Sequence, residues 1–348
     1  MVLLKKILKK IGKLLLGIII VLLINIIVGI SLIRLEVFPR IQTLIVTSTM
    51  TTLKSQYISR IFASEAQIKK IMNENRVEET VEVFDKSEIV IPKTVPPKAS
   101  EITHVIPIST KTLPTVINTD NSVKLIDIKG DGYKGHMVIV SNPKRVKLAV
   151  AKNIGKVGDK LTQLINSENA IGGINAGGFT DIGGVGNGGI PSGIIVKNRK
   201  VVWSVPSQKK YDIIGLDKDG ILTFGNLTIK EIKEKQIAYA ISFGPKLIVN
   251  NKPTKIIGDG GWGINPRSVI GQKKDGTIIL LEIDGRQLSS HGATIREVQR
   301  VMIQYGAVNA ANLDGGSSST IYYKGRLINS PCSIAGERTL PDAFVITK

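Results

Sequence analysis

The sequence contains little cysteine and little histidine. Cys332 is the only cysteine among 348 residues, so no disulfide bond can form within the chain. The three histidines, His104, His136 and His291, lie far apart and lack the spacing of a metal-binding motif. We therefore predict no metal or cofactor site, although the sequence is also compatible with a bound divalent cation.

Aromatic and acidic residues are also few. Aromatic residues make up 5% of the chain, and neither zinc-finger spacing nor an aromatic-rich RNA-binding motif occurs. The chain has 28 acidic and 47 basic residues, which gives a net charge of +19. Such a charge attracts polyanions. Without nucleic-acid motifs, an anionic glycopolymer or a membrane surface is favoured as the partner, and nucleic acid is not.

Residues 14–33 contain no charged side chain. Twenty mostly apolar residues have the length of a helix that crosses a bilayer. Five lysines in residues 1–13 predict that the N-terminus stays in the cytoplasm and that everything after Arg34 is exported. The alternative is a cleaved signal peptide, but its apolar region is usually shorter and ends at a small-residue site. We predict an uncleaved signal anchor at residues 1–34, in the cell membrane, with an extracellular C-terminal domain.

The rest of the chain divides into three segments. Residues 35–78 place apolar side chains such as Ile61, Ile68 and Ile71 at helical spacing, which predicts a helical stalk that packs on the domain or on a partner copy. Residues 79–120 contain five prolines among many threonines and serines, as an extended linker does. The folded domain is expected at residues 121–348, and the oligomeric state is not predicted.

Short strand-like segments separated by turn signals fill this domain. Residues 194–203, 213–224 and 269–283 each read as a β-hairpin. Residues 294–305 read as a helix, because Thr294 and Glu297 form a capping box before a stripe of apolar residues. Strands and helices do not alternate regularly. The expected fold is α+β, with a largely antiparallel or mixed sheet and few helices.

Ten glycines lie between residues 172 and 193. Gly184, Gly186 and Gly189 match the dinucleotide-binding fingerprint formally, but Pro191 and a β-rich segment follow where that motif needs a helix. We predict a mobile or ligand-closing loop, with a purely structural loop as the alternative. Asn175 in this segment would orient a ligand hydroxyl, or else cap its own turn.

Residues 309–320 form the most distinctive polar segment. Asp314 lies between Asn312 and the pair Gly315-Gly316, and four hydroxyl residues follow. Backbone amides in a glycine-rich turn can form an anion site, so this turn is a candidate cradle for a phosphate or a sugar. The pattern is not a nucleophile elbow, and a serine hydrolase is not supported.

Two arginines and a second aspartate complete the candidate site. Asp284 follows the apolar run 278–283, where a buried strand would emerge, and Arg286 stands two residues later. Arg267 and Arg286 can each hold a phosphate bidentately. The alternative is that these arginines form ion pairs with Asp284 and Asp314 and only stabilise turns.

At these residues the sequence resembles the phosphodiester glycosidase family, whose bacterial members are often labelled exopolysaccharide biosynthesis proteins. The resemblance spans about residues 125–348, and the stalk also resembles that of membrane-anchored members. This sequence departs from the family pattern at Ser317, where the family often has a third glycine, and at Thr180, where the family often has a second aromatic residue. The resemblance depends on five ordered segments: Ile174-Asn175-Ala176-Gly177-Gly178-Phe179, Ser242-Phe243-Gly244-Pro245, Asn265-Pro266-Arg267, Asp284-Gly285-Arg286 and Asn312-Leu313-Asp314-Gly315-Gly316-Ser317-Ser318.

The resemblance implies hydrolysis of a sugar-1-phosphodiester at the anomeric carbon, in a cell-surface glycopolymer or exopolysaccharide. Asp314 or Asp284 would act on water or attack the sugar, and Arg267 and Arg286 would bind the phosphate. The substrate-binding residues would be Asn175, Gly177, Gly178, Asn312, Gly315, Gly316, Ser317 and Ser318. The alternatives are a non-catalytic module that binds anionic wall polysaccharide, and a hydrolase of ordinary glycosidic bonds.

Overall fold

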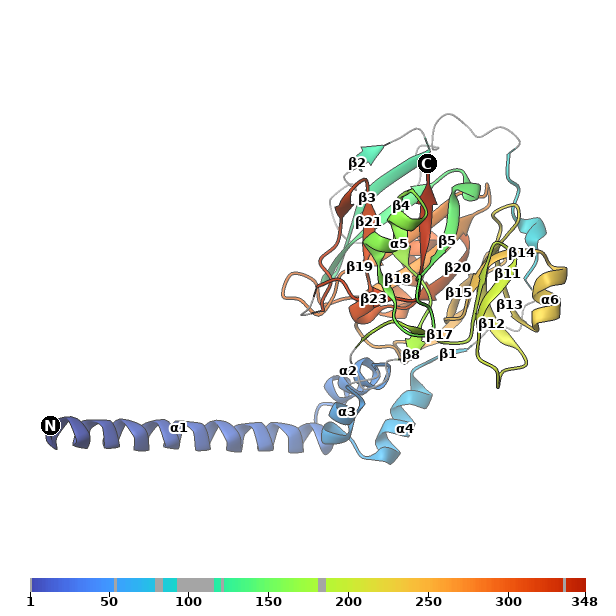
Figure 1. Ribbon diagram of the computed structural model, residues 1–348. Helices are drawn as coiled ribbons and strands as arrows, with labels where there is room; N and C mark the ends of the chain where they lie inside the picture. The colour runs from blue at the N-terminus through green and yellow to red at the C-terminus, as the bar shows by residue number, and fades with distance from the viewer. Residues whose placement is uncertain are drawn as a thin grey trace.

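The structure is a computed structural model that describes residues 2–52, 55–78, 84–92, 116–119, 122–180, 186–333 and 336–348 (Figure 1). Most of the predicted linker at 79–120, with His104, lies outside the described residues, as do Gly183 and Gly184 of the glycine-rich loop.

Three antiparallel sheets form the domain. The largest has eight strands in the order β16 (Lys252–Pro253), β15 (Lys246–Val249), β20 (Ala307–Leu313), β18 (Arg267–Lys273), β19 (Ile278–Ile283), β4 (Tyr133–Val140), β3 (Val123–Gly130) and β2 (Val116–Thr119). The second has the order β22 (Arg326–Leu327), β21 (Ile321–Tyr323), β7 (Ala170–Asn175), β24 (Asp342–Thr347) and β5 (Val146–Val150). The third has the order β11 (Lys200–Ser204), β10 (Ile194–Lys197), β14 (Ile237–Ile241), β12 (Tyr211–Asp217) and β13 (Leu222–Leu227).

Three short strand pairs complete the sheet structure of the described residues. They are β1 (Arg76–Glu78) with β17 (Lys255–Ile257), β6 (Asp159–Lys160) with β23 (Thr339–Leu340), and β8 (Phe179–Thr180) with β9 (Ile190–Pro191). The predicted α+β class with antiparallel sheets is confirmed, and so are the three predicted hairpins, β10–β11, β12–β13 and β18–β19.

The prediction that residues 172–193 form one loop is wrong at its N-terminal end. Gly172 and Gly173 lie in β7, which pairs with both β21 and β24. A Cβ atom on Gly172 would come within 2.7 Å of the Tyr322 carbonyl oxygen. These glycines therefore permit close strand packing, and the loop begins after β7.

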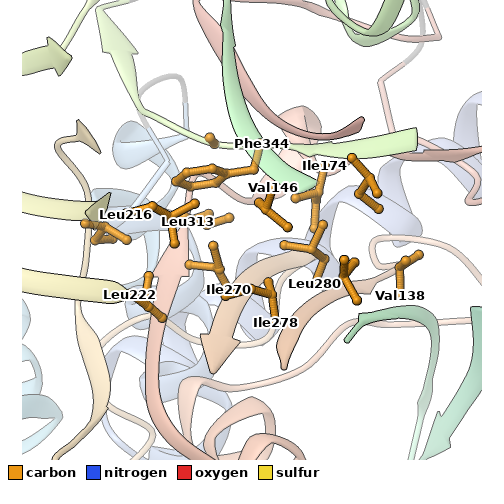
Figure 2. Close-up of a cluster of buried hydrophobic side chains, with 14 of the residues drawn as sticks. Val138, Val146, Ile174, Leu216, Leu222, Ile270, Ile278, Leu280, Leu313 and Phe344 are labelled. Carbon is orange, nitrogen blue, oxygen red and sulfur yellow. The ribbon is translucent and has the colours of Figure 1, made fainter. Parts of the chain in front are cut away.

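The main core lies between the eight-stranded sheet and the two five-stranded sheets, and Figure 2 shows part of it. Alternate side chains of β19 face opposite sides of the large sheet. Ile278 and Leu280 enter the main core, whereas Ile279 and Leu281 pack on the other face beneath α7 (Ile295–Gln304). Because both faces of β19 are buried, residues 278–283 form a nearly continuous apolar run.

Helices cover the outer faces of the sheets. The predicted helix at 294–305 is α7, and the capping box of Thr294 and Glu297 is present. The helix α5 (Leu161–Ser167) packs on the second sheet, and α6 (Ile229–Glu234) packs on the third.

The described residues of the N-terminal part are helical up to residue 74 apart from short turns. The helix α1 (Val2–Arg34) is long and apolar enough to cross a membrane, and it projects away from the domain (Figure 1). The predicted stalk is three short helices: α2 (Pro39–Met50), α3 (Gln56–Phe62) and α4 (Glu65–Glu74). We call residues 39–78 the helical module. Its strand β1 pairs with β17, so the module packs on the domain.

Phe344 provides a test of the main core. Its side chain is fully buried between the sheets. Phe344→Ala is expected to lower the free energy of unfolding by about 3–5 kcal/mol, since it removes apolar contacts and leaves a cavity. Chemical denaturation of the full chain measures the change. The matched control is Ile303→Ala on the outer side of α7, where 44% of the residue is exposed and a loss below about 1 kcal/mol is expected. Equal losses at both positions would contradict this assignment of the core.

Candidate active site

The turn that carries Asp314 follows β20 and forms the floor of a cavity of about 700 Å³. The cavity has four cationic and two acidic side chains among its lining residues, so it favours an anion. Its lining residues are Thr51, Thr52, Ser55, Lys160, Phe179, Gly186, Phe243, Trp262, Asn265, Arg267, Arg286, Asp314, Gly315, Gly316, Ser317, Ser318, Ser333, Glu337, Arg338 and Thr339.

The side chain of Asn175 holds the Asp314 turn in place. Its Nδ2 donates a hydrogen bond to the Asp314 carbonyl oxygen. Its Oδ1 accepts from Ser268 Oγ at 2.7 Å and from the Thr320 amide at 3.0 Å. The Asp314 amide donates in turn to the Ala176 carbonyl at 2.9 Å. Asn175 is fully buried, and its polar atoms are thus used inside the protein.

The Asn265-Pro266-Arg267 segment supports the turn from the other side. Asn265 Oδ1 accepts from Arg286 Nη2 at 2.8 Å and from Nε at 3.2 Å, which orients the guanidinium. The Pro266 carbonyl accepts from the Gly316 amide at 2.9 Å. Arg286 itself has a φ of 58°, in the left-handed region that non-glycine residues seldom occupy. Its backbone conformation is therefore set by the surrounding contacts.

Arg267 is held differently from Arg286. Its guanidinium donates to the carbonyl oxygens of Trp262, Gly263 and Ala293 at 2.7–2.9 Å, and only 2% of the residue is exposed. Burial lowers its pKa to about 9, which leaves it charged at neutral pH. Arg267 thus fixes the loop that carries Trp262, and it contributes positive charge from below the cavity surface.

Asp314 is the aspartate that lines the cavity. Burial raises its pKa to about 6, although hydrogen bonds from Ser318 and Gly315 and the charge of Arg338 favour the ionised form. Arg338 also donates from Nη1 to Ser317 Oγ at 2.9 Å, and its guanidinium lies 5.0 Å from the centre of the Phe179 ring. A carboxylate with such a pKa can change its protonation state near neutral pH.

A second carboxylate, that of Asp342, is fully buried and close enough to Asp314 to be affected by its charge. Its Oδ1 accepts from the Gly177 amide at 2.6 Å, and its buried Oδ2 has no hydrogen-bond partner among the described atoms. Burial, together with the charge of Asp314, raises its pKa to about 7, although the hydrogen bond from Gly177 favours the ionised form. The backbone of Asp314 is bonded to Ala176 and the side chain of Asp342 to Gly177, so the two aspartates are attached to neighbouring residues.

The prediction that backbone amides of this turn form an anion site is wrong for most of the turn. Gly316–Ser318 form a short 3₁₀ helix. The amides of Gly316, Ser318 and Ser319 donate to protein carbonyl oxygens and not into the cavity. An anion in this cavity would therefore meet guanidinium and hydroxyl groups and few backbone amides.

The structure separates the predicted site residues into two groups. Arg267, Arg286, Asp314 and residues 315–318 line the cavity, whereas Asn175, Gly177, Gly178, Asn312 and Asp284 do not.

The residues outside the cavity have partners in the protein. Asn312 donates to the Gly244 carbonyl, and Gly178 packs against the Phe243 ring. Asp284 is 2% exposed and accepts from the Ser330 amide at 3.1 Å. Burial raises its pKa and that of the neighbouring Glu282.

Sequence reasoning missed Arg338 and Asp342, and no local motif marks either of them. Among the residues that the structure describes, no group of three histidine, cysteine, aspartate or glutamate side chains could hold a metal ion.

Comparison with known proteins shows which family the chain resembles. The family model described as phosphodiester glycosidase matches residues 168–347, just over half of the chain. The chain is 28% identical to the SPbeta prophage-derived uncharacterized protein YomE of Bacillus subtilis, over 50% of this chain and 27% of that protein. It is 27% identical to the human N-acetylglucosamine-1-phosphodiester alpha-N-acetylglucosaminidase, over 34% of this chain and 26% of that protein. The matches thus span about a quarter of the length of these relatives.

Two solved structures share the fold. One is the catalytic domain of the zebrafish N-acetylglucosamine-1-phosphodiester alpha-N-acetylglucosaminidase, auto-inhibited by its pro-peptide. It aligns with a TM-score of 0.53 at 23% identity, over 65% of this chain and 82% of that one. The other is a hypothetical protein from Synechocystis, with a TM-score of 0.53 at 17% identity, over 68% of this chain and 64% of that one.

The pKa of Asp342 predicts how stability depends on pH. A folded-state pKa of about 7, above the unfolded value of 3.8, contributes stability that is present below pH 4 and lost as the pH rises through 7. The full loss is on the order of 4 kcal/mol. Asp342→Asn keeps an acceptor for the Gly177 amide and cannot ionise, so it is expected to gain stability over the parent between pH 4 and pH 8. Thermal unfolding at both pH values measures this gain.

The control is Asp219→Asn, since Lys218 lowers the pKa of that exposed aspartate. This variant should show no such gain. A parent and an Asp342→Asn variant with parallel pH profiles would contradict the raised pKa.

Proposed function

Because this chain belongs to the phosphodiester glycosidase family, we propose that it hydrolyses the bond between the anomeric carbon of a sugar and a phosphodiester oxygen. The observation that carries this proposal is the cavity in which Asp314, with a pKa of about 6, lies beside Arg286 and Arg338. The names of two relatives specify an N-acetylglucosamine-1-phosphodiester as their substrate, which supports the same class here.

The proposed reaction consumes one water molecule. The bond from the anomeric carbon to the phosphate oxygen breaks, and the phosphate monoester leaves with the bonding electron pair. Arg286 and Arg338 stabilise its negative charge, so a strong general acid is not required. The anomeric carbon gains the hydroxyl of water, and the water proton passes to a carboxylate and then to solvent.

Asp314 is the proposed base or nucleophile, because it is the aspartate that lines the cavity. Either role needs the ionised carboxylate. Asp284 lies outside the cavity, and we assign it to the support of the loop through Ser330. The charge of Asp314 helps to raise the pKa of Asp342, so Asp342 would stay protonated beside an ionised Asp314.

The cellular setting is proposed from the N-terminal helix and from the charge. The helix α1 would anchor the chain in the cell membrane with the N-terminus in the cytoplasm, so that the catalytic domain is extracellular. The excess of basic residues fits an anionic glycopolymer, such as a teichoic acid or exopolysaccharide, as the substrate. The two candidate functions, hydrolysis and binding, differ in whether this polymer is cleaved or only bound.

Release of free sugar by the detergent-solubilised full chain tests the activity. UDP-N-acetylglucosamine and purified teichoic acid are the first substrates. Asp314→Asn is expected to lower kcat by about 10²–10⁴-fold, the usual contribution of a positioned acid or base. Asp284→Asn is expected to have a smaller effect. Full activity of Asp314→Asn would rule out the assignment of Asp314.

The same assay separates the alternative functions. A binding module would retain the polymer, release no sugar and lose affinity steeply with added salt. A hydrolase of ordinary glycosidic bonds would act equally well on substrates without phosphate.

The pH profile provides an independent prediction. Since Asp314 must be ionised and its pKa is about 6, kcat/KM is expected to rise tenfold per pH unit below pH 6 and to level off above it. Measurement of initial rates between pH 4.5 and pH 8 tests this. A profile that falls between pH 5 and pH 7 would show that the essential group acts in its protonated form.

A further inference from the structure

The helical module, residues 39–78, touches the cationic side of the cavity. Thr52 Oγ1 lies 3.2 Å from Arg286 Nη2 and accepts a hydrogen bond from it. Thr51, Thr52 and Ser55 line the cavity beside Arg286. All three lie outside residues 168–347, so the matched family domain does not contain this wall.

The module is attached to the loop that precedes Asn265. Thr47 Oγ1 donates to Asp259 Oδ2 at 2.6 Å, and Ser48 Oγ accepts from the Ile264 amide at 3.2 Å. A Cβ atom on Gly263 would lie 2.2 Å from Ser48 Oγ, so only a glycine permits this approach. The module therefore contacts the loop that orients Arg286 as well as Arg286 itself.

The end of α4 makes the second attachment. Asn75 Oδ1 accepts from the Asp259 amide at 3.1 Å. The strand β1, which pairs with β17, begins at the next residue. Asp259 thus joins both ends of the module, through Thr47 of α2 and Asn75 after α4. Contacts at both ends give Thr52 a defined position relative to the domain.

A second cavity shows that the module extends the binding surface. Its volume is about 490 Å³, and it shares Thr51, Phe243 and Trp262 with the first cavity. The module supplies one wall of it, and residues 243–245 and 260–262 supply the other. The module residues are Thr51, Met72, Asn75, Arg76 and Val77. The module thus lines two adjoining cavities, which a stalk that only connects the domain to α1 need not do.

We propose that the helical module is part of the substrate-binding site and that Thr52 is a positioning residue that holds Arg286 toward the phosphate of the substrate. Asn265 and Thr52 accept hydrogen bonds from Arg286, one from the domain and one from the module. Two acceptors restrict the rotation of the guanidinium, so less conformational freedom is lost when an anion binds. This inference depends on the phosphate-binding role of Arg286 in the proposed function.

Binding of inorganic phosphate to the detergent-solubilised full chain tests this inference without any need for turnover. Thr52→Val removes the acceptor and keeps the side-chain shape, and it is expected to raise the dissociation constant of phosphate about threefold to tenfold, as loss of one hydrogen bond does. Thr52→Ser keeps the hydroxyl and should bind as the parent does. Thr43→Val changes a half-buried threonine of α2 that has no described contact with Arg286, and it should also bind as the parent does.

Titration calorimetry and the melting temperature are measured for each variant. Weaker phosphate binding by Thr52→Val at an unchanged melting temperature, with recovery in Thr52→Ser, supports the positioning role. Equal affinity of Thr52→Val and the parent would overturn it, and so would tighter binding, which would mean that Thr52 obstructs the site.

The two proposals fail in different ways. A parent that binds phosphate in the expected pattern and releases no sugar from any substrate leaves the inference standing and overturns the proposed hydrolysis. A parent that does not bind phosphate overturns the inference, whereas sugar release would still support the hydrolysis.

Discussion

The buried amide of Asn175 is the contact on which the geometry of the site depends. It joins the end of β7 in the second sheet to Ser268 in β18 and to the Asp314 turn after β20. A buried amide is costly unless its donor and acceptor atoms have partners, so the three contacts stabilise one arrangement of the two sheets. The position of Asp314 is thus fixed by the packing of the sheets, and the glycines of its turn only make the close approach possible.

The same packing accounts for the electrostatics of the site. Asp314 and Asp342 approach residues 176 and 177 from different sheets, and the enclosure that fixes them also removes water. Burial raises both pKa values, and the arginines supply positive charge on the open side of the cavity. A carboxylate with a pKa of about 6 and guanidinium groups line the same cavity, an arrangement that can accept a proton and hold an anion.

Local patterns in the sequence predicted those features that depend on local physics. The β18–β19 hairpin and the capping box of α7 are set by neighbours in the chain, and the sequence predicts both. The direction in which a buried polar side chain faces depends on strands that are distant in sequence. The sequence therefore assigns Asn175 and Asn312 to the substrate, whereas in the structure both polar atoms of the Asn175 side chain and Nδ2 of Asn312 bind the protein. Arg338 and Asp342 lie in no motif and reach the site only through folding.

The connection between α1 and the helical module is short. Four residues separate α1 from α2, and Arg34 donates to the carbonyl oxygens of Arg60 and Ile61, while Gln67 donates to the Arg34 carbonyl. With α1 in a membrane, the cavity would stand at a set height above the lipid surface. Such an enzyme would search in two dimensions and reach only those sugar phosphates presented at that height. Its selectivity would then depend on where a bond lies in the cell envelope as well as on its chemistry.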